Sequence, residues 1–353
     1  MKKMKGIRIG ERTIGEGYPI FTIAEAGVNH NGKIALARRL IDAAKEAGAD
    51  AVKFQIFKAE NFVTENAELA SYQEKNIRKK ESQREMLKRL ELSYKEFTEL
   101  KKHCDRKGII FLCTPHSEDT IDFLENLVPA YKISSGDLTN LPFLKKIAKK
   151  GKPIILSTGM ATLNEVKEAV KTIRNKGNNK IILLHCTTNY PCLLKEVNLR
   201  AMQTIKEKLN CLVGYSDHTL GIIAPIMVVA MGAVVIEKHL TLDKNLPGPD
   251  HKASLEPDEL KAMVKAIRDA EKALGNGIKR PTQSEEKIKA VVRKSIVARI
   301  DIPKGTKISK KMLTIKRPGT GLAPKYMDKI IGKRVISDIE KDELITTTNN
   351  IRI

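Results

Sequence analysis

The chain has 353 residues, of which 41% are hydrophobic and 30% charged, so it can form one large domain and a smaller one. No stretch comes near the roughly 20 apolar residues that a membrane-spanning helix needs, and the basic N-terminus is not followed by the apolar segment of a signal peptide. We therefore expect a cytoplasmic protein that has no membrane partner.

The net charge is +22, and residues 276–353 hold half of it, with 19 Lys and Arg against 8 Asp and Glu. A lysine-rich solvated surface accounts for most of this charge. We expect no nucleic-acid partner, because the chain has no tryptophan and few aromatic residues to stack on bases. A phosphorylated small molecule fits the charge as well. The five cysteines form no CxxC pair, so neither a disulfide framework nor a structural zinc site is predicted.

From residue 21 onward, eight apolar runs of strand length alternate with amphipathic helical patterns. Eight such units in about 255 residues have the size and order of a (β/α)8 TIM barrel, and a doubly wound open sheet is the competing fold. The longest interruption, 58–92, is highly charged and is predicted to form a helical insertion over the top of the barrel. The expected strands cover 21–27, 50–57, 108–115, 130–136, 153–159, 180–187, 211–217 and 233–240.

The clearest helix follows the last of these strands. Pro257 stands at a first-turn position, and Leu260, Met263, Val264 and Ile267 form one apolar face. The pattern changes after Gly275, where Gly, Pro and polar residues predict a linker.

We thus expect a barrel over 1–275, a linker over 276–288 and a small, mostly β domain over 289–353. The short runs of this last segment, broken by Pro-Lys-Gly and Pro-Gly, predict strands and turns. A domain of this size has a small core of its own, so docking against the barrel is expected.

In a barrel of this kind the loops after the strands build the active site. Any single polar residue there has an ordinary explanation as a helix cap or loop residue. Here all eight predicted strands end in polar groups, which favours a catalytic site. These groups include Glu25, Lys53, Gln55, Thr114, Lys132, Ser135, Asp137, Ser157, Thr188, Tyr190, Ser216, His218, Glu237 and His239.

His218 and His239 end neighbouring predicted strands, so their imidazoles can reach one divalent metal ion. Two nitrogen ligands with carboxylates nearby suit manganese, and magnesium, zinc and iron stay open. Such an ion would polarise a carbonyl.

Lys53 and Lys132, with Ser135, Ser157 and Ser216, form a cationic, hydroxyl-rich ring that suits a phosphate and a carboxylate. The rival interpretation is an aldolase that uses a lysine Schiff base with pyruvate. Glu25 is the candidate general acid or base.

Several motifs resemble the sialic acid synthases, in order over nearly the whole chain. The tail, from VRKSIVARIDIPKGTKI to KRPGTG, resembles their antifreeze-like (SAF) domain. The matching barrel motifs are AEAGVNHNG (24–32), KFQ (53–55), YKISSGDLTN (131–140), LSTGM (156–160), LHCTTNYP (184–191), GYSDHT (214–219), IEKHLT (236–241) and PGPDHKASLEP (247–257).

The resemblance implies a transferase that condenses phosphoenolpyruvate with an N-acylated hexosamine to give a nine-carbon, sialic-type acid and phosphate. The sugar would be N-acetylmannosamine or a 2,4-diacetamido-trideoxyhexose, and legionaminate and pseudaminate synthases are close variants of this activity. A non-enzymatic carbohydrate-binding or ice-binding protein is a third hypothesis, which rests on the tail.

The resemblance also implies roles for single residues. His218 and His239 would bind the metal, most readily Mn²⁺, with Mg²⁺ or Co²⁺ as alternatives. Arg317 would come from the partner of a domain-swapped homodimer. Asp137 stands where many relatives have glutamate, and Thr188 where some have asparagine. Phosphoenolpyruvate would contact Lys53, Thr114, Lys132, Ser135, Ser157, Thr188 and Ser216, and the sugar Gln55, Asp137, Tyr190, Asp250 and Arg317.

Overall fold

The computed structural model describes residues 6–77, 81–348 and 351. The chain divides into two compact units, residues 1–275 and 276–353. None of the helices within the described residues is long and apolar enough to cross a membrane.

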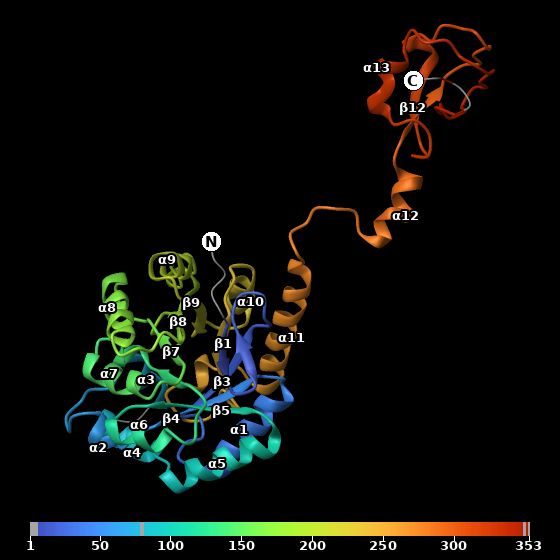
Figure 1. The fold of residues 1–353 in the computed structure, drawn as a ribbon. Coiled ribbons are helices and arrows are strands. Elements are labelled where there is room, and N and C mark those ends of the chain that lie inside the picture. The colour runs from blue at the N-terminus through green and yellow to red at the C-terminus, as the bar shows by residue number, and fades with distance from the viewer. Residues whose placement is uncertain (1–5, 78–80, 349–350, 352–353) are drawn as a thin grey trace. The chain divides into compact units, whose positions relative to one another are not determined.

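The first unit is a barrel of eight parallel strands with helices around it, so the predicted (β/α)8 fold is confirmed (Figure 1). Hydrogen-bonded neighbours follow the order β5-β4-β3-β10-β9-β8-β7-β6, in which β10, the last barrel strand of the chain, pairs with β3, the first. The strands at the two ends of this order, β5 and β6, lie against each other and complete the ring. The strands are β3 (Phe21–Gly27), β4 (Ala51–Ile56), β5 (Ile110–Pro115), β6 (Tyr131–Ile133), β7 (Ile154–Ser157), β8 (Ile181–Cys186), β9 (Leu212–Asp217) and β10 (Val235–His239).

Several barrel helices begin at capping signals that the sequence shows. A capping box of Ser93 and Glu96 starts α5, and Gly108 ends it in a left-handed conformation. The helix predicted after the last strand is α11, whose apolar face is buried as expected. The helices are α1 (Ile34–Glu46), α2 (Ala59–Phe62), α3 (Ser71–Ile77), α4 (Gln83–Leu90), α5 (Tyr94–Lys107), α6 (Glu118–Leu124), α7 (Leu141–Lys149), α8 (Leu163–Arg174), α9 (Arg200–Leu209), α10 (Ile223–Ala230) and α11 (Pro257–Leu274).

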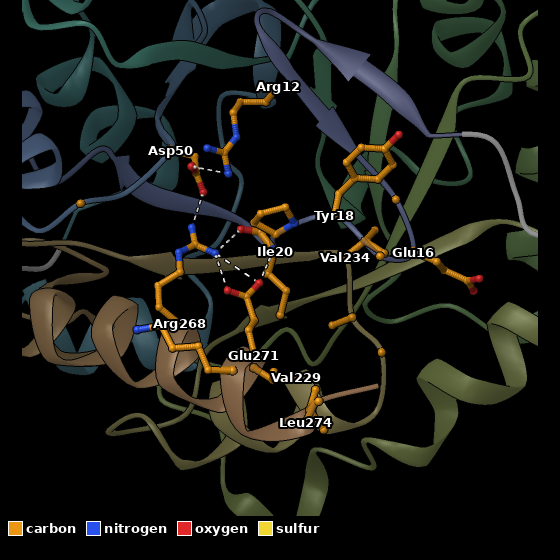
Figure 2. A pocket seen from close by; sticks show the side chains of 18 of the residues that line it. Arg12, Glu16, Tyr18, Ile20, Asp50, Val229, Val234, Arg268, Glu271 and Leu274 are labelled. Atoms are coloured by element: carbon orange, nitrogen blue, oxygen red, sulfur yellow. Dashed lines mark hydrogen bonds and ion pairs between the residues drawn. The ribbon is translucent and has the colours of Figure 1, made fainter. Parts of the chain in front are cut away.

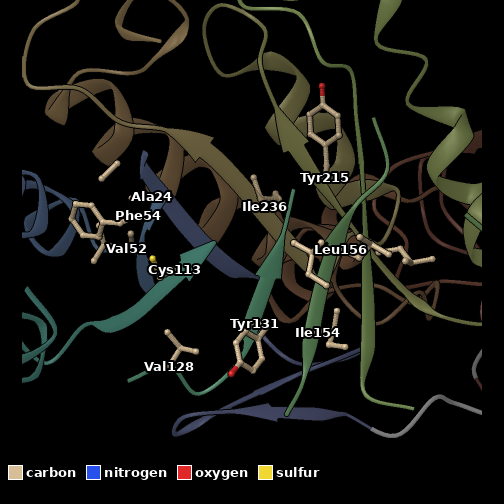
Figure 3. Packing of buried hydrophobic residues seen from close by; sticks show 14 of the residues in the cluster. Ala24, Val52, Phe54, Cys113, Val128, Tyr131, Ile154, Leu156, Tyr215 and Ile236 are labelled. Carbon is tan, nitrogen blue, oxygen red and sulfur yellow. The ribbon is translucent and has the colours of Figure 1, made fainter. Parts of the chain in front are cut away.

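Along each strand, successive side chains point alternately toward the surrounding helices and toward the barrel interior. Val52 and Phe54 of β4 belong to the outer hydrophobic layer, in which they lie near Cys113 of β5 (Figure 3). Lys53 and Gln55 alternate with them and face inward, where both line a cavity. The alternation of side chains along the strand therefore places apolar residues in the core and polar residues in the barrel interior.

A hairpin that the sequence did not predict fills the N-terminal end of the barrel. Its strands are β1 (Ile7–Ile9) and β2 (Arg12–Ile14), paired antiparallel. Ile9 and Ile14 are fully buried in one hydrophobic cluster with Phe21. The interior is thus closed at this end, which leaves the carboxyl ends of the strands for a site.

A hollow of about 1030 Å³ also lies at the N-terminal end, between this hairpin and α11. Figure 2 shows an ion-pair network across it: Asp50 binds Arg12 at 3.0 Å and Arg268 at 2.9 Å, and Arg268 binds Glu271 at 3.1 Å. These side chains are engaged with one another and tie β2 to α11. The hollow is larger than the cavity at the strand ends, but it lies at the end of the barrel that does not carry catalytic loops.

The second unit has a small core of its own, in which Ile296, Ile330 and Ile345 are fully buried. Its antiparallel pair is β11 (Ser295–Ala298) and β12 (Leu313–Lys316), and α13 (Met327–Ile330) packs nearby. The residues predicted as a linker, 276–288, run into α12 (Gln283–Val292), which a capping box of Thr282 and Glu285 begins.

Candidate active site

A cavity of about 260 Å³ lies at the carboxyl ends of the barrel strands. It is lined by side chains from all eight strands or the loops that follow them. Because the strands are parallel, residues far apart in sequence meet here. The predicted residues that line it are Glu25, Lys53, Gln55, Thr114, Lys132, Ser135, Ser157, Thr188, Tyr190, Ser216, His218 and His239.

Strand register places Glu25 between an imidazole and a lysine. In the ladder, Glu25 of β3 is opposite His239 on one side and Lys53 on the other. The register shifts between Glu25 and Gly27, and Gly27 has a φ of +52°, which favours glycine. A carboxylate oxygen of Glu25 lies 2.8 Å from Lys53 Nζ, and Gln55 donates to the other oxygen at 2.9 Å.

A second carboxylate, Glu237 of β10, lies between the two lysines. Its oxygens are 3.4 Å from Lys132 Nζ and 3.6 Å from Lys53 Nζ, and Ser216 donates to it at 2.8 Å. Burial opposes ionisation of Glu237, but Lys132 and Lys53 hold the pKa of its carboxyl below the ordinary value. The cavity therefore carries two buried cations, each next to a buried carboxylate.

Burial shifts the pKa values of the other charged groups in different directions. It raises the pKa of Glu25 and lowers the pKa of Lys132, although Glu237 works against the second shift. Burial also opposes the charge of Lys53, but Glu237 and Glu25 together raise its pKa above the ordinary value. The amine of Lys53 thus stays protonated to a higher pH than the amine of Lys132.

The imidazole rings of His218 and His239 lie 5.5 Å apart between centroids, and both line the cavity. Nδ1 of His218 is 2.7 Å from the carbonyl oxygen of Thr187, so it donates there and leaves Nε2 with a lone pair. Burial lowers the pKa of His218 to about 4 and the pKa of His239 well below its ordinary value. Both rings are therefore neutral near pH 7.

The strands that carry these histidines are held together behind the site. Lys238 Nζ lies 2.5 Å from Asp217, and both side chains are fully buried. Gly214 makes the close approach possible, because a Cβ there would lie 2.4 Å from the carbonyl oxygen of Val235 on the neighbouring strand. The pair and the glycine fix the distance between β9 and β10, and hence between the residues that follow them.

Three of the predicted substrate residues do not line this cavity. Asp137 accepts a hydrogen bond from Ser134 at 2.9 Å and lies 3.6 Å from His116. Ser134 lines the cavity, and Asp137 contacts this residue without lining the cavity itself. Asp250 lines an adjoining hollow, where burial raises its pKa to about 7. Arg317 is an exposed residue of the second unit.

A protein-family model described as the NeuB family matches residues 40–279, and a model of the SAF domain matches residues 293–349. The chain belongs to the NeuB family. An N,N'-diacetyllegionaminic acid synthase of Legionella pneumophila is 49% identical over 95% of this chain and 94% of its own. The human N-acetylneuraminate-9-phosphate synthase is 37% identical over 95% and 93%.

The structural comparison agrees with the sequence comparison. The crystal structure of an N-acetylneuraminic acid synthetase from Leptospira borgpetersenii, in complex with citrate, matches with a TM-score of 0.73 at 38% identity. The match covers 82% of this chain and 96% of that one.

The site contains buried polar atoms that the protein itself does not satisfy. Thr188 Oγ1 and His239 Nδ1 have no hydrogen-bond partner among the described residues. Gly159 leaves room for Thr188, since a Cβ there would lie 2.2 Å from the hydroxyl oxygen. Buried polar atoms are nearly always paired, so a ligand is expected to supply these partners.

A divalent metal fits the two neutral imidazoles, which lie within reach of each other and have lone pairs available. Within the part of the chain that the structure describes, no three or more His, Cys, Asp or Glu side chains form a metal cluster. A metal held by His218 and His239 would therefore take its other ligands from water or substrate.

The sequence assigned no role to several side chains of the lining. Glu237 was visible at the end of its strand, but only the fold shows that it lies between the lysines. Phe62 and Tyr72 come from the insertion over the barrel top, and Tyr72 lies 5.0 Å from the ring of Tyr190. Their position depends on how α2 and α3 fold back, for which the sequence carries no local signal.

Proposed function

We propose that this protein is a transferase that condenses phosphoenolpyruvate with an N-acylated hexosamine, giving a sialic-type nonulosonic acid and phosphate. One observation carries the proposal: a single buried cavity places two lysines and several hydroxyls beside two neutral imidazoles. The membership of the NeuB family and the names of its relatives as sialic-type acid synthases support the same activity.

The lysines and hydroxyls form the half of the cavity that suits an anion. Lys53 and Lys132 would hold the phosphate and the carboxylate of phosphoenolpyruvate, with Ser157, Thr188 and Ser216 as hydroxyl partners. Glu25 and Glu237 balance the lysines in the protein by itself. The site is thus built before the ligand arrives, and its charges need little rearrangement during the reaction.

The imidazoles form the half that suits the sugar. A divalent metal bound by His218 and His239, which we propose to be Mn²⁺, would supply Lewis-acid polarisation of the sugar carbonyl. Tyr190 lies 4.1 Å from His218 between ring centroids and covers this end of the cavity against water.

In the proposed reaction, C3 of phosphoenolpyruvate forms a bond to the aldehyde carbon of the open-chain sugar. Water then adds to C2, and the C–O bond to phosphate breaks. Glu25 is positioned to hold or release a proton, because its carboxyl is buried between Lys53 and Gln55 and burial raises its pKa. Lys53 and Lys132 keep the phosphate in place as its charge grows.

Incubation of the protein with Mn²⁺, phosphoenolpyruvate and a panel of N-acyl hexosamines tests the proposal. Phosphate release that depends on both the sugar and phosphoenolpyruvate supports it. With ¹⁸O in the bridging position of phosphoenolpyruvate, the label should appear in the released phosphate. Label retained in the organic product would contradict C–O cleavage.

A lysine Schiff base with pyruvate is the competing chemistry, and the lowered pKa of Lys132 favours an amine at this position. The raised pKa of Lys53 keeps its amine protonated, which suits the binding of an anion and opposes a Schiff base at that residue. Borohydride reduction in the presence of pyruvate distinguishes the two, since a stable adduct on either lysine would overturn the condensation mechanism.

We also propose a homodimer in which Arg317 of the partner subunit contacts the sugar. The support is the exposure of Arg317 in a unit that matches the SAF domain.

A cytoplasmic location fits the use of phosphoenolpyruvate and the five cysteines, all buried as free thiols.

A further inference from the structure

Two adjacent serines, Ser134 and Ser135, directly follow β6, and both line the catalytic cavity. The resemblance assigns Ser135 to phosphoenolpyruvate and gives Ser134 no role. The two hydroxyls have different partners in the protein, so they present different groups to a ligand.

The hydroxyl of Ser134 donates to Oδ2 of Asp137 at 2.9 Å. Burial opposes ionisation of Asp137, but contacts with His116 and Ser134 hold the pKa of its carboxyl below the ordinary value. Asp137 is therefore a carboxylate near pH 7, and a carboxylate only accepts hydrogen bonds. Because the proton of Ser134 is committed to Asp137, the serine oxygen offers its lone pairs to the cavity.

The carboxylate of Asp137 is held from two further sides. Asn140 Nδ2 lies 3.4 Å from Oδ1, a long contact, and His116 Nδ1 lies 3.6 Å from Oδ2. The side chain of His116 is only 5% exposed, and its ring stacks on Phe62 with 4.2 Å between centroids. His116 thus connects the carboxylate to α2 of the insertion, and these neighbours fix the direction of the Ser134 proton.

Ser135 is oriented in the opposite sense. Its Oγ accepts a hydrogen bond from the backbone N–H of Gly159 at 3.0 Å. Cys186 Sγ lies 3.2 Å away, and a thiol sulfur is only a weak acceptor. The proton of Ser135 is therefore available to an anionic ligand, as its assignment to phosphoenolpyruvate requires.

The two substrates of the proposed reaction differ in what they offer a hydroxyl. Phosphoenolpyruvate near neutral pH carries carboxylate and phosphate oxygens, which accept hydrogen bonds, whereas a sugar also carries O–H and N–H donors. An anionic oxygen against the lone pairs of Ser134 would place two acceptors together, with the charge of Asp137 behind them. Ser134 therefore suits the sugar, and Ser135 suits phosphoenolpyruvate.

We infer that Ser134 accepts a hydrogen bond from an O–H or N–H of the acceptor sugar, and that Asp137 and His116 are positioning residues that act through it. The inference rests on the proposed condensation and adds a specificity-determining residue to it. It replaces the direct contact between Asp137 and the sugar that the resemblance implies, because Ser134 lines the cavity and Asp137 lies behind it.

The first test compares Ser134→Ala with Ser135→Ala in the full-length protein. Assays contain Mn²⁺, phosphoenolpyruvate and either N-acetylmannosamine or a 2,4-diacetamido-trideoxyhexose, whichever gives faster phosphate release. Ser134→Ala should raise the KM for the sugar about tenfold and leave the KM for phosphoenolpyruvate unchanged, since one hydrogen bond to the sugar is lost. Ser135→Ala should instead raise the KM for phosphoenolpyruvate.

An unchanged KM for the sugar in Ser134→Ala, or equal rises for both substrates, overturns the inference while the proposed condensation stands. No phosphate release by the unaltered protein with either sugar overturns both.

The second test is a double-mutant cycle of Ser134→Ala and Asp137→Asn. The amide of the asparagine can donate to Ser134 and reverse its hydroxyl, so Asp137→Asn alone should raise the KM for the sugar. In the Ser134→Ala background the same change should alter this KM by no more than about twofold, because Asp137 acts through Ser134. Losses that multiply would show that Asp137 contacts the sugar itself and would overturn its positioning role.

His116→Phe keeps a ring on Phe62 and removes the nitrogens beside Asp137. It should follow the same pattern, with a higher KM for the sugar only where Ser134 is present. Far-UV circular dichroism checks that each variant is folded. A rise in the KM for the sugar that is equally large in the Ser134→Ala background would contradict the role of His116.

Discussion

Replacing Lys238 by methionine should lower the stability of the barrel by about 3–5 kcal/mol, because Asp217 then stays buried without its counter-charge. Both side chains have no exposed area, and the two charged groups lie 2.5 Å apart. At about 2–4 °C per kcal/mol, the melting temperature should fall by roughly 6–20 °C. The chain has no tryptophan, so far-UV circular dichroism is the suitable probe of unfolding.

Two further variants separate the buried charge from the loss of a lysine as such. Lys265→Met removes an ion pair whose side chains are 78% and 50% exposed, so the change should stay within about 0.5 kcal/mol. Adding Asp217→Asn to Lys238→Met removes the unpaired charge but keeps an oxygen for Tyr215, and should recover at least half of the loss. If Lys238→Met costs no more than Lys265→Met, the pair does not hold β9 and β10 together.

The remaining predictions concern the catalytic cavity. His218→Ala and His239→Ala should each abolish turnover and weaken Mn²⁺ binding, measured by calorimetry, with an unchanged circular dichroism spectrum; near-normal activity in either would contradict a shared metal. Glu237→Gln should make phosphoenolpyruvate raise the melting temperature more than in the unaltered protein, because the ligand then supplies the counter-charge that Lys132 has lost. Equal shifts would argue against that role. Arg317→Ala should raise the KM for the sugar more than the KM for phosphoenolpyruvate. A mixture of the Arg317→Ala and His218→Ala proteins should recover activity if the arginine acts across a dimer.

The sequence determined the barrel and much of its site because both depend on local patterns. The eight apolar runs became the eight parallel strands, and the polar residues after them met at one end, since parallel strands align their carboxyl ends. His218 and His239 could be paired in advance because the strands before them are neighbours in the barrel.

Only the tertiary structure decided which side chains share a space. The closing of the barrel brings Glu237 between Lys53 and Lys132, three residues from three different strands. The fold of the insertion places Tyr72 over the cavity, and the loop after β10 takes Asp250 into the hollow that adjoins the cavity. These placements come from contacts between segments far apart in the chain, and periodicity within one segment carries no information about them.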